Sequence, residues 1–210
     1  GSDELIYLDI SGDDKYDIKR DDLNYKNTPI FLDIIKKVSK VTFMPITVGG
    51  KIKNLLDAEK RLAVGADKIS VNSAAIENPD FIINLAKEFG SQCVVISVDV
   101  KIIDNKYKIL SHGGTKISNY ELEEYINIVE KNGAGEILVN SIDRDGLGIG
   151  YDLNLLNMVT DRCKIPVIAC GGVGKWQHFS DALSKTKVDA VSAANIFWYT
   201  DQSIYLSKKY

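Results

Sequence analysis

The stretch GGKIKNLLDAEKRLAVGADKISVNSA, residues 49–74, shares its layout with GGVGKWQHFSDALSKTKVDAVSAANI, residues 171–196. A gap-free alignment pairs Gly49 with Gly171, Gly50 with Gly172, Lys53 with Lys175, Asp67 with Asp189 and Ser70 with Ser192. In both copies two glycines end an apolar strand, a helix follows, and an aspartate precedes the next strand. Five identities are a weak match alone, but the shared layout favours a duplicated half-barrel.

Short apolar runs of the same kind recur along the whole chain. Seven of them are typical of parallel strands covered on both faces, namely residues 4–10, 44–50, 68–73, 94–100, 136–141, 166–172 and 190–195. The segments between them are typical of helices, which we expect to begin at Thr28-Pro29, Asn78-Pro79 and Asp152. Residues 101–114 depart from this alternation and predict a small hairpin that turns at Asp104-Asn105.

Strands that alternate with helices predict βαβ units and a parallel α/β sheet. The second half of the chain holds four of the predicted strands, and the first half holds three. We therefore predict a (β/α)8 TIM barrel of two half-barrel repeats, with residues 1–210 as a single domain that lacks the first βα unit. In this interpretation the chain is truncated at its N-terminus or incompletely represented. An open doubly wound sheet is the alternative, which fits seven strands but not the two-fold repeat.

Composition limits the classes of function. The 210 residues are 45% hydrophobic and 26% charged, with a formal net charge of −3, so neither a nucleic acid nor a membrane is the expected partner. No apolar run approaches the roughly 20 residues of a membrane span, and the acidic start GSDEL does not resemble a signal peptide. The three cysteines and two histidines lack the spacing of a metal site or a disulfide framework. We therefore expect a cytoplasmic protein without a bound metal.

The active site of such a barrel lies at the C-terminal ends of its strands. The predicted strand ends carry Asp9, Gly49, Gly50, Asn72, Ser73, Asp99, Asp143, Arg144, Asp145, Gly171, Gly172, Ala194 and Asn195. A glycine pair lets the backbone approach an anion, and the following helix N-terminus offers free N–H groups. Two such pairs at a two-fold mouth suit a ligand with a phosphate at each end, although either pair alone is also typical of a tight βα turn.

Asp99 is the candidate for proton transfer. It ends an apolar strand, and burial there raises the pKa of a carboxylate and suits it to acid–base catalysis. An ion pair with Lys101 or with a loop lysine is the structural alternative. By the two-fold repeat, the counterpart of Asp99 would lie on the missing first strand.

The segment NSIDRDG, residues 140–146, holds more charge than a plain turn needs. We expect Asp145 to contact the ligand directly, while Asp143 and Arg144 brace one another across the loop. Elsewhere at the mouth, Asp9 either bonds a ligand hydroxyl or caps its own loop. Lys51, after the first glycine pair, either contacts phosphate or faces solvent.

The chain resembles the cyclase subunit of imidazole glycerol phosphate synthase, the HisF family, along nearly its whole length. The resemblance is carried by DELIYLDI (3–10), ITVGG (46–50), GADKISVNSAA (65–75), FGSQCVV (89–95), GAGEIL (133–138), SIDRDG (141–146) and VIACGGVGK (167–175). It implies a barrel of two fused half-barrels that receives ammonia from a HisH-like glutaminase subunit. The implied substrate is phosphoribulosyl-formimino aminoimidazole carboxamide ribotide, a small molecule with two phosphates. The implied products are imidazole glycerol phosphate, for histidine biosynthesis, and aminoimidazole carboxamide ribotide.

The resemblance also assigns roles to residues, and it implies no cofactor. Asp99 matches one of two general acid–base aspartates, the second of which belongs to the first strand. Implied ligand contacts are Gly50, Asn72, Ser73, Asp145, Gly146, Gly171, Gly172, Ala194 and Asn195. Glu4, Lys68 and Glu136 match a charged gate through which ammonia enters, and Asp67 falls on the surface that faces the glutaminase.

Departures from the family pattern keep a second function open. Lys51 stands where the family has a third glycine, Asn195 stands where serine is usual, and residues 11–27 are longer than the family's loop. The alternative is a HisF-like ammonia-delivery partner of a sugar amidotransferase in lipopolysaccharide or other surface-glycan biosynthesis. The segments TFMPITVGG (42–50) and NIFWYTDQS (195–203) are similar to such paralogues. A third hypothesis is an inactive fragment with open sheet edges.

Overall fold

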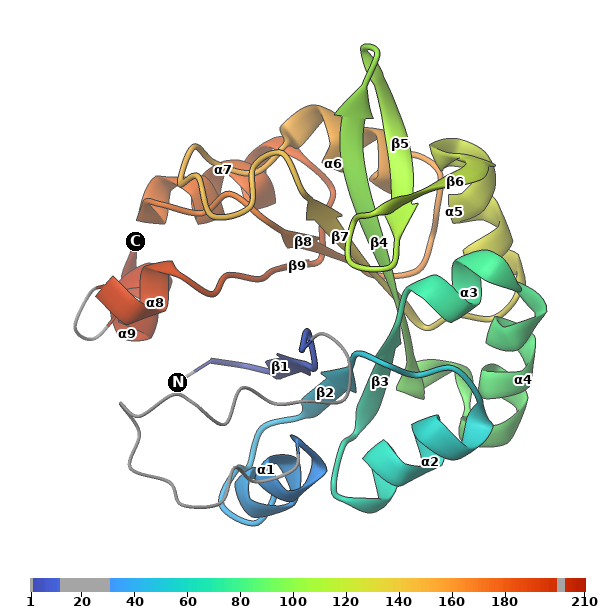
Figure 1. Cartoon of the computed structure of the whole chain (residues 1–210). Helices are drawn as coiled ribbons and strands as arrows, with labels where there is room; N and C mark the ends of the chain where they lie inside the picture. The colour runs from blue at the N-terminus through green and yellow to red at the C-terminus, as the bar shows by residue number, and fades with distance from the viewer. Residues whose placement is uncertain (1, 12–30, 200–202) are drawn as a thin grey trace.

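The computed structural model describes residues 2–11, 31–199 and 203–210, which form a curled α/β sheet with helices around its outer side (Figure 1). The main path of strands runs β1-β2-β3-β4-β7-β8-β9, and each neighbouring pair in it is parallel. The strands are β1 (Leu5–Leu8), β2 (Ile46–Gly49), β3 (Lys68–Val71), β4 (Val94–Ile103), β7 (Glu136–Ser141), β8 (Val167–Cys170) and β9 (Ala190–Val191). The predicted parallel α/β arrangement is confirmed, and β1 and β9 lie at the two ends of the curl.

Helices follow the strands and cover the outer face of the sheet (Figure 1). They are α1 (Phe31–Val38), α2 (Leu55–Ala63), α3 (Ser73–Glu77), α4 (Asp80–Phe89), α5 (Leu122–Lys131), α6 (Leu153–Thr160), α7 (Trp176–Lys185), α8 (Ile196–Tyr199) and α9 (Ser203–Lys209). Asp152 caps α6 as predicted, because its side chain accepts a hydrogen bond from the Leu155 N–H at 3.1 Å. The predicted helix start at Thr28-Pro29 lies outside the described residues. In the described ranges, no helix has the length and apolar character needed to cross a membrane.

Alternation of side chains along the strands separates two apolar layers. The larger layer lies between the sheet and the helices, and its strand residues include Ile69, Ile96, Val98, Ile137 and Val139, each 0% exposed. The opposite face of β4, β7 and β8 holds a smaller cluster of Val95, Leu138 and Ile168. Further along this inner face lie Ser97 and Asp99 on β4, Asn140 on β7 and Cys170 on β8, so the apolar cluster forms a floor beneath a polar mouth.

The duplicated layout is matched by duplicated hydrogen bonds. Asp67 Oδ2 accepts from the Ile46 N–H at 2.8 Å, and Asp189 Oδ2 accepts from the Val167 N–H at 2.9 Å. The backbone N–H of each aspartate donates in return to the carbonyl of the same strand residue, at 2.8 and 3.0 Å. Both aligned aspartates therefore fasten the chain just before β3 or β9 to the first residue of the preceding parallel strand.

The predicted hairpin extends β4 beyond the mouth of the curled sheet. Asp104 and Asn105 form its turn, with φ values of 49° and 59° that suit these two residue types. The returning strand β5 (Lys106–Ser111) pairs with β4 and also with β6 (Lys116–Glu121). The strand β6 was not predicted, because its sequence KISNYE is largely exposed and lacks an apolar run.

Candidate active site

Three neighbouring strands, β4, β7 and β8, carry candidate site residues near the C-terminal end of their inner face. These residues are Asp99, Asn140 and Cys170. The strand register places Asp99 opposite Asn140, and Asn140 opposite Cys170. Asn140 Nδ2 donates a hydrogen bond to Asp99 Oδ1 at 3.1 Å. Among the described residues, the side-chain partner of Asp99 is Asn140 and not Lys101, so an ion pair with Lys101 is not supported.

Burial raises the pKa of Asp99, which is the property predicted for it. The hydrogen bond from Asn140 opposes the shift, and the nearby charge of Asp145 adds to it. Burial also raises the pKa of the Cys170 thiol to about 11, so that this cysteine is an uncharged neighbour at neutral pH. A carboxyl group that holds its proton more tightly than usual is suited to donating it as well as accepting it.

The NSIDRDG loop is fixed on two sides. Asp143 Oδ2 accepts from the Ile102 N–H at 2.6 Å, which ties the loop to the hairpin. Arg144 donates to the Gly150 carbonyl at 3.3 Å and lies 3.8 Å from the Asp152 carboxylate. The prediction that Asp143 and Arg144 brace one another is therefore wrong, because each side chain binds a different neighbour across the loop.

The second residue of each glycine pair is required by close backbone packing. A Cβ on Gly50 would lie 2.2 Å from the Asp9 carbonyl oxygen, and one on Gly172 would lie 2.3 Å from the Gly150 carbonyl oxygen. Both glycines also have positive φ, 86° and 104°. The tight-turn interpretation is thus confirmed for Gly50 and Gly172, and their contact with an anion stays a prediction.

Residues of the predicted second phosphate site converge from three strand ends. A Cβ built on Gly171 would lie 2.9 Å from Asn140 Oδ1, and one on Gly146 would lie 3.9 Å from Asn195 Nδ2. Asn195 follows Ala194, whose carbonyl accepts the Phe197 N–H at the start of α8. The loops after β7, β8 and β9 therefore meet at one place. No group of three His, Cys, Asp or Glu side chains in the described ranges is placed to hold a metal ion.

The first glycine pair is surrounded by charged side chains. Asp9 Oδ1 accepts from the Ser11 N–H at 3.1 Å and from the Ser11 hydroxyl at 2.6 Å, which confirms that Asp9 caps its loop. Lys51 has a φ of 55°, and its Nζ donates to Ser11 Oγ at 2.8 Å and lies 3.7 Å from Asp9 Oδ2. Arg61, which the sequence did not single out, is buried and donates to the Gly50 carbonyl at 2.5 Å. The feature of the sequence that could have identified Arg61 is its position on the inward side of α2.

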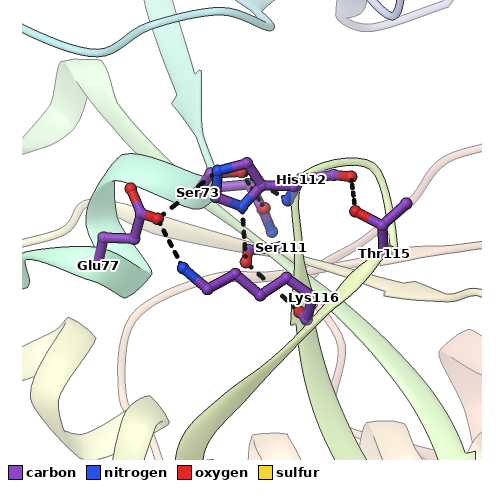
Figure 2. Close-up of polar contacts among 7 residues, drawn as sticks. Ser73, Glu77, Ser111, His112, Thr115 and Lys116 are labelled. Carbon is purple, nitrogen blue, oxygen red and sulfur yellow. Dashed lines mark hydrogen bonds and ion pairs between the residues drawn. The ribbon is translucent and has the colours of Figure 1, made fainter.

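Asn72 and Ser73 lie at the end of β3, where the first-half phosphate contacts were predicted. Asn72 Nδ2 donates to the Ser97 carbonyl at 3.0 Å, and the Ser73 hydroxyl donates to Asn72 Oδ1 at 3.2 Å. The His112 N–H in the β5–β6 turn donates to Ser73 Oγ at 2.9 Å (Figure 2). Gly49 on the adjacent strand β2 leaves room for the side chain of Ser70, since a Cβ on Gly49 would lie 2.8 Å from the Ser70 Cβ. These side chains are thus held in place by two neighbouring strands and the hairpin.

Glu4, Lys68 and Glu136 meet at the opposite end of the strands, as predicted. Lys68 Nζ lies 2.6 Å from Glu136 Oε1 and 3.0 Å from Glu4 Oε2. Burial by itself lowers the pKa of Lys68, but the hydrogen bonds to Glu136 and Glu4 outweigh burial and the net shift is upward. The second oxygen of Glu136 is buried and has no hydrogen-bond partner among the described residues.

Comparison with known proteins decides the family. Residues 3–203 match the family described as "Histidine biosynthesis protein". The chain is 42% identical over 212 residues to imidazole glycerol phosphate synthase subunit HisF of Clostridium botulinum, covering all of this chain and 79% of that protein. The chain belongs to the HisF family. HisF subunits from Caulobacter vibrioides and Alkaliphilus metalliredigens are 41% and 40% identical over 211 and 205 residues, which cover 100% and 97% of this chain and 77% of each relative.

This HisF-family chain has a cluster of polar residues at each end of its sheet. The polar mouth around Asp99 and the partly exposed cluster around Lys68 lie at opposite ends of the same strands. Asn140 was also missed in the sequence, although it directly follows Val139 in a predicted strand and precedes the NSIDRDG aspartates. Its partner Asp99 lies 41 positions earlier in the chain, so only the pairing of β4 with β7 reveals the contact.

Proposed function

We propose that this chain is the cyclase subunit of imidazole glycerol phosphate synthase, a lyase of histidine biosynthesis. The observation that carries the proposal is the Asp99–Asn140 pair at the polar mouth of a HisF-family fold. Ammonia supplied by a glutaminase reacts with phosphoribulosyl-formimino aminoimidazole carboxamide ribotide. Cleavage and ring closure then yield imidazole glycerol phosphate and aminoimidazole carboxamide ribotide.

Asp99 is the general acid–base residue in this proposal. The reaction needs a group that accepts a proton from the attacking nitrogen and returns one to the leaving nitrogen. The partly buried Asp99 has the upward pKa shift that such exchange requires, and Asn140 fixes which of its oxygens is free to face substrate. Asn140 therefore acts as a positioning residue that limits the rotation of the carboxyl group.

The substrate's two phosphates occupy two sets of strand-end residues in this proposal. One set is Gly49, Gly50, Asn72 and Ser73, and the other is Asp145, Gly146, Gly171, Gly172, Ala194 and Asn195. Support comes from the convergence of the second set and from the left-handed conformation of its glycines, a backbone geometry that can turn N–H groups toward an anion. In this arrangement Asp145 accepts a hydrogen bond from a ligand hydroxyl.

Ammonia enters at the opposite end, between Glu4, Lys68 and Glu136, where a HisH-like glutaminase subunit docks. Lys68 bridges the two carboxylates across the end of the curled sheet, and a salt-bridged cluster of this kind can open when a partner rearranges it. The partnerless Glu136 oxygen supports a further donor at this gate. A basic side chain from an additional strand would supply that donor.

One additional βα unit completes the barrel in this proposal, placed between β9 and β1. Among the described residues, each of these strands pairs with only one neighbour in the sheet. Unpaired parallel edges are a liability that closure of a barrel removes. The 77–79% of each relative's length that this chain spans leaves room for such a unit. It would also supply the second catalytic aspartate.

Lys51 favours a second candidate function, ammonia delivery to a sugar amidotransferase of a surface-glycan pathway. A lysine with φ 55° occupies the glycine position next to the first phosphate set, and it pairs with Asp9 there. If this pair closes the phosphate set, the chain passes ammonia on without cyclising anything itself.

The two functions are separated by turnover of the full-length protein. The substrate ribotide is supplied with excess ammonium salt, and separately with glutamine and a glutaminase. Turnover under both conditions supports the cyclase. A folded protein that stimulates the glutaminase yet turns over no ribotide contradicts the cyclase and supports the delivery function.

A further inference from the structure

The β5–β6 turn, residues 112–115, lies against one face of α3 (Figure 2). Its His112 N–H donates to Ser73 Oγ at 2.9 Å, at the first residue of α3. Glu77, the last residue of α3, has its Oε1 3.6 Å from His112 Nε2 and 3.1 Å from Lys116 Nζ. Ser73 and Glu77 are separated by one helical turn, so they share a face and both contact the same hairpin.

His112 is held in an uncommon backbone conformation. Its φ is 53°, in the left-handed region, and its carbonyl accepts from the Thr115 hydroxyl at 2.7 Å. The imidazole lies between two elements, because Nδ1 is 3.1 Å from Ser111 Oγ on β5 and Nε2 faces Glu77 on α3. The imidazole thereby fixes the hairpin turn to α3, and the turn directs its backbone N–H at Ser73.

The contact with His112 determines which way the Ser73 hydroxyl points. A serine hydroxyl has one hydrogen to donate and two lone pairs to accept with. The His112 N–H fills a lone pair, so the hydrogen is directed away from the turn, toward Asn72 Oδ1 at 3.2 Å. A donor on the oxygen also polarises the O–H and makes it a stronger donor to the next acceptor. An arriving phosphate oxygen can replace Asn72 as that acceptor.

We propose that His112 and Glu77 are positioning residues for the phosphate contact of Ser73. The imidazole of His112, clamped between Ser111 and Glu77, holds the turn so that its N–H pre-orients the Ser73 hydroxyl toward substrate phosphate. This inference rests on the proposed function for the identity of the phosphate ester, but the Ser73 contact itself is testable with inorganic phosphate. The side chains of His112 and Glu77 are 48% and 47% exposed, so each contributes modestly and the clamp can be loosened without unfolding the chain.

The test is a double-mutant cycle on the full-length protein with inorganic phosphate as the probe. His112→Gly keeps the backbone N–H and accepts the left-handed conformation but removes the imidazole. Glu77→Gln removes the carboxylate charge, and Ser73→Ala removes the hydroxyl. Lys187→Ala is the matched control, since Lys187 forms an exposed pair with Asp161 at 2.6 Å remote from this turn. Calorimetry gives the phosphate dissociation constant, and steady-state kinetics with the ribotide give KM and kcat.

His112→Gly and Glu77→Gln are each expected to weaken phosphate binding about threefold to tenfold, and to have no further effect once Ser73 is alanine. KM should rise by the same factor, with kcat within about twofold of the unchanged protein. Equal weakening in the Ser73→Ala background, or no weakening at all, would overturn the positioning role. Phosphate coupling without ribotide turnover would overturn the cyclase function and leave the positioning role standing. Ribotide turnover without this coupling would overturn the positioning role and leave the cyclase function standing.

Discussion

Asn140 donates a 3.1 Å hydrogen bond to Asp99 across the β4–β7 pairing, and this bond opposes the upward pKa shift that burial imposes on the carboxyl. The two residues are direct partners in the parallel register. Burial therefore raises the pKa of the proposed catalytic group, and a neighbour that carries no charge limits how far it rises.

Asn140→Ala is predicted to raise the pKa of Asp99 further, because the opposing hydrogen bond is lost. Any limb of the pH–rate profile that reports Asp99 ionisation should move to higher pH. Because the folded-state pKa lies above the ordinary value of 3.8, Asp99 costs stability as pH rises through that window, and the variant should extend the loss to higher pH. Asn132→Ala, which removes a donor to the Pro79 carbonyl, is the control that should leave the profile unmoved.

Lys51→Gly is predicted to make the protein more stable and the phosphate site weaker. Release of a lysine from φ 55° should add about 1 kcal/mol to the unfolding free energy, after the greater chain entropy of glycine is subtracted. Loss of the ammonium beside the first glycine pair should raise KM about fivefold. Lys51→Asn separates the two effects, since asparagine accepts the left-handed conformation without a charge. A KM that is unchanged in both variants would contradict a role for Lys51 in phosphate binding.

Gly50→Ala is predicted to be far more damaging than Gly113→Ala, although both glycines have positive φ. A Cβ at Gly50 would lie 2.2 Å from the Asp9 carbonyl oxygen, while one at Gly113 meets nothing within 4 Å. The expected loss of unfolding free energy is about 3 kcal/mol for Gly50 and about 1 kcal/mol for Gly113. Denaturant titration measures both, and similar losses would mean that Gly50 is not packed against the Asp9 backbone.

Lys68→Met is predicted to lower the free energy of unfolding by about 2 kcal/mol, because the carboxylates of Glu4 and Glu136 at the proposed gate lose their shared cation. The raised pKa of Lys68 makes this contribution fully present below about pH 10.5 and lost as pH rises through the folded-state pKa. Turnover with ammonium salt should persist while coupling to glutamine falls. Lys208→Ala breaks an exposed pair with Asp3 and should change neither stability nor coupling. Equal loss of ammonium-dependent and glutamine-dependent turnover would contradict the role of this cluster as an ammonia gate.

Sequence patterns were sufficient to predict those features of the structure that depend on residues close together in the chain. The strands are apolar runs, the Asp104-Asn105 turn has its own chemistry, and the aligned Asp67 and Asp189 occupy matching hydrogen bonds. The loops after β7, β8 and β9 also met as expected, because parallel strands bring their carboxyl ends to one edge.

Two sets of contacts between distant segments escaped prediction. Asp143 was expected to pair with the adjacent Arg144, but its carboxylate binds the Ile102 N–H on the hairpin instead. His112 contacts Ser73 and Glu77 only because the unpredicted strand β6 returns the hairpin over α3. Such contacts depend on how strands pair, and no local periodicity encodes them.

The most direct test of the central claim is ribotide turnover by full-length Asp99→Asn protein with excess ammonium salt, beside the unchanged protein. We expect a fall of at least about 100-fold in kcat, with a thermal midpoint at pH 7 that is unchanged or higher, because a partly buried carboxyl that resists ionisation is replaced by a neutral isostere. Turnover within about twofold of the unchanged protein would show that Asp99 transfers no proton in the reaction and is not the general acid–base residue.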